Sequence, residues 1–280
     1  MKLQNRIDFA VVIVAECCNP NGDPLNGNRP RHDYDGYGEI TDVCIKRKIR
    51  NRLQDMGERI FVQASERSDD GCRSLQERAN SFEPLKKEIK NGVKANRDLC
   101  IKLACEEWID VRSFGQIFAF KGAEASFGVR GPVSLRYARS LEPIDPISTQ
   151  ITKSVNSADT GSWEKDSATM GIRHRIDRAV YVTYGSILPQ LAGTTGFSEE
   201  DAEKIKYAMQ TMFEGDASSA RPAGTMEVAK LFWWKHNCKW GQCSTAKVHH
   251  SLHFTPTKTY PYFEVEIDPI PGLEPEIIDM

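Results

Sequence analysis

The first residues that could do chemistry are cations placed close to a loop rich in glycine, asparagine and proline. The loop, residues 19–31, carries the polar and basic side chains of Asn19, Asn21, Asn26, Asn28, Arg29 and Arg31. A basic stretch follows at Lys46, Arg47 and Arg50. Glycine and asparagine permit backbone turns that aim N–H groups at one ligand, and the cations neutralise negative charge. This combination indicates a surface for phosphate groups.

Two further groups of cations occur later in the chain. Arg112 stands two residues before Phe114, and this pair could serve a base or a phosphate. A buried aromatic surface is the alternative interpretation of that stretch. The second group, predicted to lie on the arms of a hairpin, comprises Lys153, Arg173, His174 and Arg175.

The sequence supports an enzyme active site or a metal site less well than it supports a phosphate-binding surface. The loop from Asn19 resembles the start of an EF-hand, but Pro24 stands where glycine is needed and Pro30 where glutamate is needed. Cys238 and Cys243, with four nearby histidines, raise zinc as an alternative, although the spacing fits no standard site. No phosphate-binding P-loop, nucleophile elbow or zinc-protease motif is present. We therefore expect a binding subunit that is not an enzyme and holds no cofactor or metal.

The composition limits the class of protein. The chain has 280 residues, 40% of them hydrophobic, with 37 Lys and Arg against 39 Asp and Glu. The net charge of −2 excludes a globally basic nucleic-acid binder, so any such site must be local. The scattered cysteines and the absence of a signal peptide or membrane span predict a cytoplasmic protein that binds no membrane.

Six elements are expected to position these residues. Residues 6–16 are almost continuously apolar and predict a central strand. Thr41 or Asp42 is a good N-cap for a helix whose apolar stripe is Ile45, Ile49, Leu53 and Met56. Later elements are predicted as strands at 128–137, 179–187 and 231–235, with a helix at 198–213. This order predicts an α+β, ferredoxin-like or RNA-recognition-type fold.

Large insertions interrupt that core. The prolines and glycines of residues 17–40 predict a loop with no regular element at its start. Residues 65–98 are highly charged and predict a partly helical insertion, and residues 148–178 predict a long β-hairpin. Residues 245–267 read as strand-like pieces, and residues 268–280 as an acidic, proline-containing tail. We expect a single domain over 1–280.

Six ordered motifs resemble those of a known family. They are residues 19–31, 41–50, 110–116, 128–133, 150–156 and 170–175. Together they are similar to the repeated backbone subunit of type I-C CRISPR surveillance complexes, a Cascade-type family with an RNA-recognition-motif core. The resemblance covers essentially the whole chain.

The resemblance implies a palm with finger insertions at 65–98 and a β-hairpin thumb at 148–178. It implies that copies of the subunit polymerise helically along CRISPR RNA and present it for pairing with a target DNA strand. Other subunits of the complex and a recruited helicase-nuclease would be further partners. Carried onto this chain, the loop 19–31 with Lys46, Arg47 and Arg50 would hold guide phosphates. Lys153, Arg173 and His174 would lie near the RNA backbone, with Met170 or Trp163 as a wedge between bases.

One alternative within the same superfamily stays open. Related type III backbone subunits cut target RNA with a loop aspartate, and Asp23, Asp33 and Asp35 are candidates for such a metal-dependent ribonuclease. A zinc-stabilised structural protein is the third and weakest hypothesis.

Overall fold

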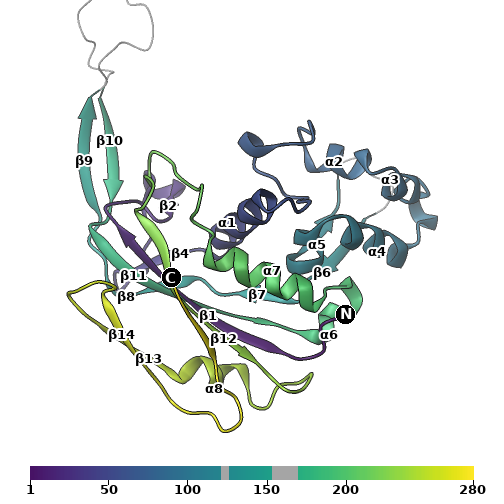
Figure 1. The fold of residues 1–280 in the computed structure, drawn as a ribbon. Helices are drawn as coiled ribbons and strands as arrows, with labels where there is room; N and C mark the ends of the chain where they lie inside the picture. Colours follow the sequence, from purple (N-terminus) through teal and green to yellow (C-terminus); the bar gives the residue numbers. More distant parts are fainter. Residues whose placement is uncertain (121–125, 153–169) are drawn as a thin grey trace, which may run out of the picture.

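An antiparallel sheet runs through the middle of the computed structural model, which describes residues 1–120, 126–152 and 170–280 (Figure 1). Its strands lie in the order β15, β12, β1, β11, β8 and β4, and the short strand β7 also pairs with β11. Their bounds are Ile7–Glu16 (β1), Tyr37–Ile40 (β4), Val133–Leu135 (β7), Ala138–Pro143 (β8), Arg178–Ile187 (β11), Met226–Lys235 (β12) and Glu276–Asp279 (β15).

β1 is the central strand. It pairs with β11 from Ile7 opposite Ile187 to Glu16 opposite Arg178, and with β12 on its other side. Side chains alternate along a strand, so β1 contributes to two cores. One core takes Phe9, Val11 and Ile13, and the other takes Ala10, Val12 and Val14. Burial on both faces explains why residues 6–16 are apolar without interruption.

Helices cover one face of the sheet (Figure 1). They are α1 (Asp42–Asp55), α6 (Pro189–Thr195) and α7 (Glu199–Gln210). Thr41 caps α1 by accepting a hydrogen bond from the Cys44 backbone N–H, and a capping box at Ser198 begins α7. The apolar stripe of α1 then packs on the sheet through Ile45, Ile49 and Leu53.

The opposite face is covered by the short helix α8 (Thr245–His250) and the hairpin of β13 (Leu252–Pro256) and β14 (Phe263–Ile267). Val248, Leu252 and Phe263 bury their side chains there. These elements close the second core, against the strand residues Phe232 and Trp234.

The charged insertion folds around a core of its own. Its elements are η2 (Ser65–Arg67), α2 (Leu75–Ser81), α3 (Glu83–Ile89), η3 (Gly92–Lys94), α4 (Arg97–Glu107), α5 (Ile109–Phe114), β5 (Gly115–Phe118) and β6 (Phe127–Arg130). Phe61 packs between Trp108 and Phe118, with both ring centroids at 4.7 Å. The insertion therefore stands beside α1 as a separately packed lobe (Figure 1).

Two hairpins lie near the other end of α1. The longer one pairs β9 (Ile147–Thr152) with β10 (Met170–Arg175) and projects away from the sheet (Figure 1). The shorter one pairs β2 (Gly22–Asp23) with β3 (Arg29–Pro30) across the 3-10 turn η1 (Pro24–Asn26).

The structure confirms the predicted mixture of helices with an antiparallel sheet, and it corrects four details. The strand predicted at 128–137 is divided, because β6 pairs with β5 in the insertion and only β7 joins the main sheet. The segment 19–31 is a small hairpin with regular hydrogen bonds, whereas an irregular loop was expected. Residues 245–250 are helical where strand-like pieces were expected, because Ser244 caps them by accepting from the Lys247 N–H. The expected acidic tail ends in β15, which pairs with β12 and is held by Lys206–Glu276 and Lys230–Asp279 ion pairs. No helix among the described residues is both long and apolar enough to cross a bilayer.

Candidate nucleic-acid interface

The small hairpin at 19–31 owes its shape to turn chemistry. The Asp23 carboxylate accepts a hydrogen bond from the Leu25 N–H at 3.3 Å and caps the turn that Pro24 begins. Gly27 and Asn28 follow with φ of 57° and 64°, a conformation that glycine and asparagine tolerate best. The Asn28 N–H then closes the hairpin on the Asp23 carbonyl at 2.7 Å.

Two of the predicted asparagines hold this hairpin in place. Asn19 is buried, and its amide donates to the Asn28 carbonyl at 2.7 Å. The Asn21 side chain accepts from both the backbone N–H (3.0 Å) and the hydroxyl (3.1 Å) of Thr41, the N-cap of α1. Asn19 and Asn21 therefore position the hairpin on the helix, while Asn26 and Asn28 are exposed at its tip.

The two arginines of the hairpin differ. Arg31 forms a 3.0 Å ion pair with Asp23. Arg29 is exposed, and within the described part of the chain it has no ion pair. Arg29 is thus the cation of this hairpin that is available to an anionic ligand without exchanging a partner.

The basic residues of α1 are engaged inside the protein. Lys46 pairs with Asp42 at 2.9 Å, one helical turn away. Arg47 donates to the Val62 carbonyl at 2.5 Å, and Arg50 donates to the Asp110 carboxylate at 2.9 Å. All three cations thus have partners within the described structure: Lys46 pairs inside the helix, whereas Arg47 and Arg50 join neighbouring segments to α1.

Arg112 and Phe114 are engaged in the same way. Arg112 forms a 2.8 Å ion pair with Asp201 at the start of α7, and Asp201 is also the capping-box residue of that helix. Phe114 lies half-buried against the core, with the Arg50 guanidinium 5.0 Å from its ring centre. These contacts fit the alternative that residues 112–114 belong to a buried aromatic surface, and they do not favour a site for a base.

The β9–β10 hairpin has two chemically different faces. Residues directly opposite each other in the pairing share a face, and the faces alternate along each strand. One face carries Met170, Ile172 and His174; the other carries Arg173 and Arg175. Met170 and Ile172 are neighbours on the first face and are exposed by 57% and 67%, whereas Ile151, exposed by 49%, lies on the same face as Arg173. The structure therefore places Arg173 and His174, both expected near the RNA backbone, on opposite faces of the hairpin, and Met170 lies on the face of His174.

The polar contacts of this hairpin differ between its residues. His174 contacts the Ser148 hydroxyl at 2.8 Å, and Arg175 pairs with Asp177 at 3.2 Å. Arg173 is exposed, and no ion pair to it occurs among the described residues. The predicted contacts at Lys153 and Trp163 lie outside the described residues.

The structure brings the two hairpins together. Cα atoms of β10 and β3 approach within 8 Å, and both hairpins lie at the same end of the sheet (Figure 1). At their common base the Ile176 N–H bonds to the Cys18 carbonyl at 2.8 Å, and the Cys17 N–H bonds to the Asp177 carbonyl at 2.7 Å. Segments about 150 residues apart in sequence thus form one surface, with Arg29 and Arg173 on it.

Sequence reasoning missed a third wall of this surface, residues 214–225. Asp216 pairs with Lys48, whose side chain is only 5% exposed, and Asp216 also lies 3.8 Å from Arg221. The Asn19 N–H donates to the Ala220 carbonyl at 2.9 Å, which aligns this segment with the hairpin base. Lys48 was the one sequence signal for this contact: a lysine beside the apolar stripe of α1 is expected to be buried, and a buried lysine needs an acidic partner.

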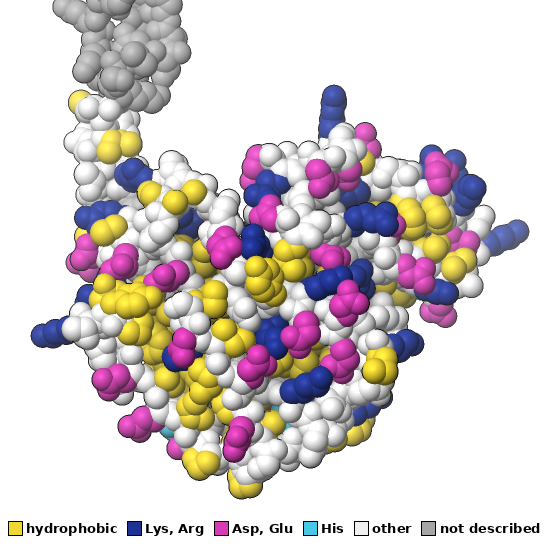
Figure 2. Space-filling model, viewed as in Figure 1, with side chains coloured by type: hydrophobic (Ala, Val, Ile, Leu, Met, Phe, Trp, Pro, Cys, Tyr) yellow, Lys and Arg dark blue, Asp and Glu magenta, His cyan; other side chains and the backbone are white. Residues whose placement is uncertain are grey.

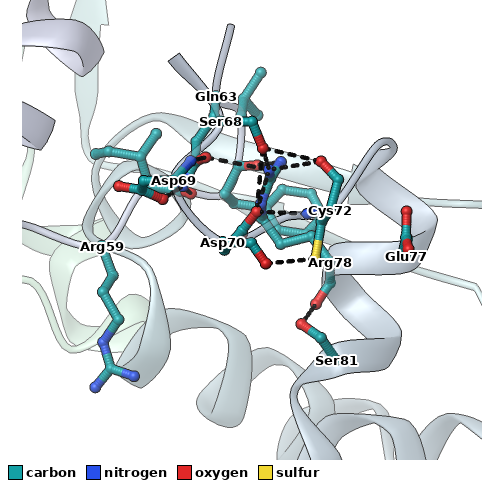
Figure 3. A network of polar contacts seen from close by, with 12 residues as sticks. Arg59, Gln63, Ser68, Asp69, Asp70, Cys72, Glu77, Arg78 and Ser81 are labelled. Atoms are coloured by element: carbon teal, nitrogen blue, oxygen red, sulfur yellow. Dashed lines mark hydrogen bonds and ion pairs between the residues drawn. The ribbon is translucent and has the colours of Figure 1, made fainter. Parts of the chain in front are cut away.

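The insertion is locked to α1 by a polar network around Arg78 (Figure 3). The guanidinium is buried and donates to both oxygens of Asp70 and, at 2.9 Å, to the Phe61 carbonyl. The hydrogen bonds from Arg78 lower the pKa of Asp70 from 3.8 to about 2. Gln54 of α1 donates to Asp69 in the same loop at 2.8 Å, so the network fixes the insertion beside the helix.

Two of the three aspartates proposed for a nuclease, Asp23 and Asp33, are also engaged, and Asp35 is exposed. Asp23 caps η1 and pairs with Arg31. Asp33 accepts from the Tyr37 N–H at 2.9 Å and from Arg139 at 3.0 Å. Desolvation opposes ionisation of Asp33, but these hydrogen bonds outweigh it and hold its pKa below the usual value. Among residues 1–120, 126–152 and 170–280, no three or more His, Cys, Asp or Glu side chains gather as metal ligands would.

Two histidines of the zinc hypothesis have other partners. His236 is buried and bonds to the Asp8 carboxylate at 2.9 Å, and His249 bonds to the Gly185 carbonyl at 3.1 Å. Cys238 is exposed and Cys243 is half-buried.

Charge on the visible face is mixed. Figure 2 shows Lys and Arg side chains interspersed with Asp and Glu, and no continuous basic patch covers this face. Lys46, Lys48 and Arg50 of α1 each lie beside a carboxylate, so they add no net basic charge near the helix. A nucleic-acid surface here would depend on a few unpaired groups placed by the two hairpins.

Comparison with known sequences identifies relatives. The model of the family described as CRISPR-associated protein Cas7 matches residues 5–268. The CRISPR-associated protein Cas7 of Haloferax volcanii is 28% identical over 225 residues, which cover 73% of this chain. The same match covers 63% of the relative, so this chain spans less than two thirds of the relative's length.

Comparison with solved structures finds a similar fold. A chain of a structure described as "CRISPR RNA-guided surveillance complex, pre-nicking" aligns with a TM-score of 0.50 and 13% identity, over 82% of this chain and 78% of that one. A chain of a second "CRISPR RNA-guided surveillance complex" aligns with a TM-score of 0.45 and 14% identity, over 82% and 68%. Because the family model spans nearly the whole sequence, this chain belongs to the Cas7 family of CRISPR-associated proteins.

Proposed function

We propose that this protein is the repeated, guide-RNA-binding backbone subunit of a CRISPR surveillance complex of the type I-C kind. Its copies would polymerise along the CRISPR RNA and present it for pairing with target DNA. The observation that carries the proposal is the surface formed by the β2–β3 and β9–β10 hairpins in a chain whose family model spans residues 5–268. The subunit would act by binding and not by catalysis.

The arrangement of elements supports a division into palm, fingers and thumb. Strands β12, β1, β11 and β8 are neighbours in that order, with α1 and α7 on one face, as in a ferredoxin-like or RNA-recognition-type palm. The lobe built on 65–98 would be the fingers, and the projecting β9–β10 hairpin, within 148–178, the thumb. This organisation makes 1–280 one domain with insertions.

Phosphate binding in this proposal falls first to Arg29 and Arg173, which form no ion pair with any described residue, with Asn26 at the tip of the β2–β3 hairpin. Lys46 and Arg31 would contribute by exchanging a carboxylate for a phosphate. Arg47, Arg50 and Arg112 would hold the surface in shape through their internal partners. Contacts to phosphates carry no sequence information, which suits a carrier of guides with different spacers.

The exposed Met170 of the thumb suits a different task. Met170 is exposed on it beside Ile172, and an apolar side chain can replace the stacking partner of a displaced base. Arg173 would meanwhile meet the RNA backbone from the opposite face of the same hairpin. The proposed partners are thus CRISPR RNA, the paired target strand, further copies, other complex subunits and a recruited helicase-nuclease.

The experiment that tests this function is purification of the protein from cells that carry a CRISPR array, followed by sequencing of the bound RNA. We expect repeat-spacer RNA at several copies of protein per RNA. A matched pair of variants locates the site: Arg29→Ala with Arg173→Ala should weaken binding of all spacer sequences and lower the salt slope by about one to two. Lys258→Ala, an exposed cation in the turn after β13, is the control. Equal effects of both variants would contradict the assigned surface.

The ribonuclease alternative is not favoured, because the structure assigns turn-capping and ion-pairing roles to Asp23 and Asp33. Incubation of the assembled complex with complementary RNA and Mg²⁺ tests it directly. We expect intact RNA, and regularly spaced products that disappear in Asp23→Asn or Asp33→Asn would restore the alternative.

A further inference from the structure

The segment 214–225 carries one arginine, Arg221, whose guanidinium is only weakly engaged. Its Nε lies 3.8 Å from the Asp216 carboxylate, and its Nη1 donates to the Asn19 carbonyl at 3.5 Å, which is long for a hydrogen bond. Nε is buried and has no hydrogen-bond acceptor within the described part of the chain. Buried donors are nearly always paired in folded proteins. Because 24% of the Arg221 side chain is exposed, its remaining N–H donors can be met by a ligand that arrives from solvent.

The charges around Asp216 do not balance. Asp216 is the carboxylate beside both Lys48 and Arg221, so one negative charge faces two positive charges. Glu214, the other acid of the segment, pairs with Arg52 instead. Burial lowers the pKa of Lys48, and the like charge of Arg221 lowers it further, whereas the bond to Asp216 opposes this shift without cancelling it. An anion bound to Arg221 would complete the neutralisation of this cluster.

The turn that carries Arg221 is held in a fixed position. The Ser218 N–H donates to the Arg221 carbonyl at 2.8 Å, and the Arg221 N–H donates back to the Ser218 carbonyl at 3.1 Å. After the turn, the Glu16 N–H at the end of β1 donates to the Thr225 carbonyl at 2.8 Å. A cation on such a turn needs little ordering when it binds, so its position is decided before a ligand arrives.

The same turn carries two hydroxyl groups. Ser218 and Ser219 are exposed, and the Ser218 Oγ accepts from the Arg221 N–H at 3.2 Å, so its own proton can be donated to a ligand. The loop lies beside β2 (Figure 1), and Asn19, which Arg221 contacts, directly follows Cys18 at the base of the β9–β10 hairpin. A planar guanidinium on a turn with hydroxyl groups suits the oxygens of a phosphate.

We propose that Arg221, with Ser218 and Ser219, binds one phosphate of the guide RNA at the base of the β9–β10 hairpin and sets the position of the RNA on each copy. This role rests on the proposed function and adds a residue to its binding surface. Arg29 and Arg173 are exposed on the hairpins and would attract the RNA backbone, whereas the fixed guanidinium of Arg221 would hold one phosphate in place. RNA is a better occupant than a carboxylate of another copy, because Arg221 adjoins the base of both hairpins.

The first test pairs the residue with its phosphate. A single neutral methylphosphonate is moved along a short RNA that binds one copy, and affinity is measured by fluorescence anisotropy. We expect one position at which the parent protein loses about tenfold in affinity, the size of a charge-assisted hydrogen bond. Arg221→Ala should bind the unmodified RNA about tenfold more weakly, with a salt slope lower by about one, and should lose no further affinity at that position. If Arg221→Ala keeps the sensitivity of the parent at every position, the proposal is overturned.

The second test separates phosphate binding from a role in shaping the loop. Asp216→Asn removes the carboxylate that competes for Arg221, so RNA binding should become about twofold to fivefold tighter. Weaker binding, as in Arg221→Ala, would mean that the ion pair only shapes the wall and would overturn the proposal. Arg52→Ala is the matched control, because it frees Glu214 in the same segment and keeps the Arg221 guanidinium. It should retain the methylphosphonate-sensitive position, and it decides alone if Asp216→Asn does not fold.

The two proposals fail in different ways. If the parent protein binds RNA and Arg221→Ala binds it with the same affinity and salt slope, the role of Arg221 fails and the proposed function stands. If the parent binds no RNA, the proposed function fails, and calorimetry with inorganic tripolyphosphate still tests the anion site. We then expect binding to the parent and none to Arg221→Ala, and no binding to the parent would overturn the site. Association of copies without RNA that Arg221→Ala abolishes would assign the guanidinium to a carboxylate of another copy and would also overturn the proposal.

Discussion

Helix α1 and the β9–β10 hairpin contain similar cations but use them differently. Arg47 and Arg50 of α1 are turned inward, where they bond to the Val62 carbonyl and the Asp110 carboxylate. Arg173 of the hairpin is exposed, without an ion pair in the described part of the chain. A basic stretch in a sequence therefore does not imply a basic surface, because the carboxylates that neutralise it can come from distant segments.

The same difference between α1 and the β9–β10 hairpin separates residues that stabilise the fold from residues that are available to bind a ligand. Asp110 is fully buried and accepts from Arg50, Phe61 and Val62, so it joins α1, the insertion and α5. The hairpin arms make few such contacts and are free to meet a ligand. Substitutions in the two regions should thus affect different measurements.

The largest expected effect on stability is at Asp110, the acceptor for the inward-facing Arg50 of α1. Asp110→Ala leaves Arg50 and two backbone N–H groups without their acceptor and should lower the free energy of unfolding by about 3–5 kcal/mol. Urea denaturation followed by circular dichroism measures it. A loss below about 1 kcal/mol would show that Asp110 does not hold these segments together.

A smaller loss is expected in the finger lobe. Asp70→Asn weakens the contact with buried Arg78 and should cost about 1.5–3 kcal/mol at pH 7. Because folding lowers the pKa of Asp70 from 3.8 to about 2, its stabilising contribution is complete above about pH 4 and is lost as pH falls through 2. The difference between parent and variant, measured by urea denaturation at pH 7 and pH 3, should therefore shrink at pH 3. A difference that grows would contradict this assignment.

A substitution in the β9–β10 hairpin should affect RNA binding and leave stability nearly unchanged. Arg173→Ala is expected to leave the unfolding free energy within about 0.5 kcal/mol and to weaken RNA binding about fivefold, with a salt slope lower by about one. Fluorescence anisotropy at several salt concentrations measures both quantities. Arg173→Lys is the matched control and should retain the slope. Unchanged RNA affinity in Arg173→Ala would remove this face of the hairpin from the site.

The smallest effect is expected at the boundary between the two regions. Lys46 is part-exposed, and its ion pair within the described residues is with Asp42, a turn away, so Lys46→Ala should cost about 0.3–0.5 kcal/mol. If Lys46→Ala weakens RNA binding more than Arg173→Ala, the pairing in the free protein does not predict the RNA-binding residues, and the contrast between helix and hairpin fails.

Elements with strong local signals were predictable. The apolar run at 6–16 became β1, Thr41 and Ser198 cap α1 and α7 as expected, and the arms of the 148–178 hairpin pair as β9 and β10. Each signal lies within a few residues of the feature that it predicts. β15 was missed because a short acidic strand after several prolines forms only when β12 offers its open edge.

The site was predictable by segment but not by residue. The segments 19–31 and 170–175 do meet, yet the register of β9 and β10 decides that Met170 and Arg173 face opposite ways. The segment 214–225 gave no signal, because its contribution is an aspartate whose partner, Lys48, is 168 residues away.

The sequence alone determined the periodic elements, their caps and the set of groups available for phosphate binding. These depend on side-chain spacing and turn chemistry, which are local properties of the chain. Only the tertiary structure decided which of those groups are free. Whether a cation is available to a ligand or stabilises the fold depends on whether an acceptor lies beside it. For Arg47, Arg50 and Arg112 that acceptor comes from a segment distant in sequence.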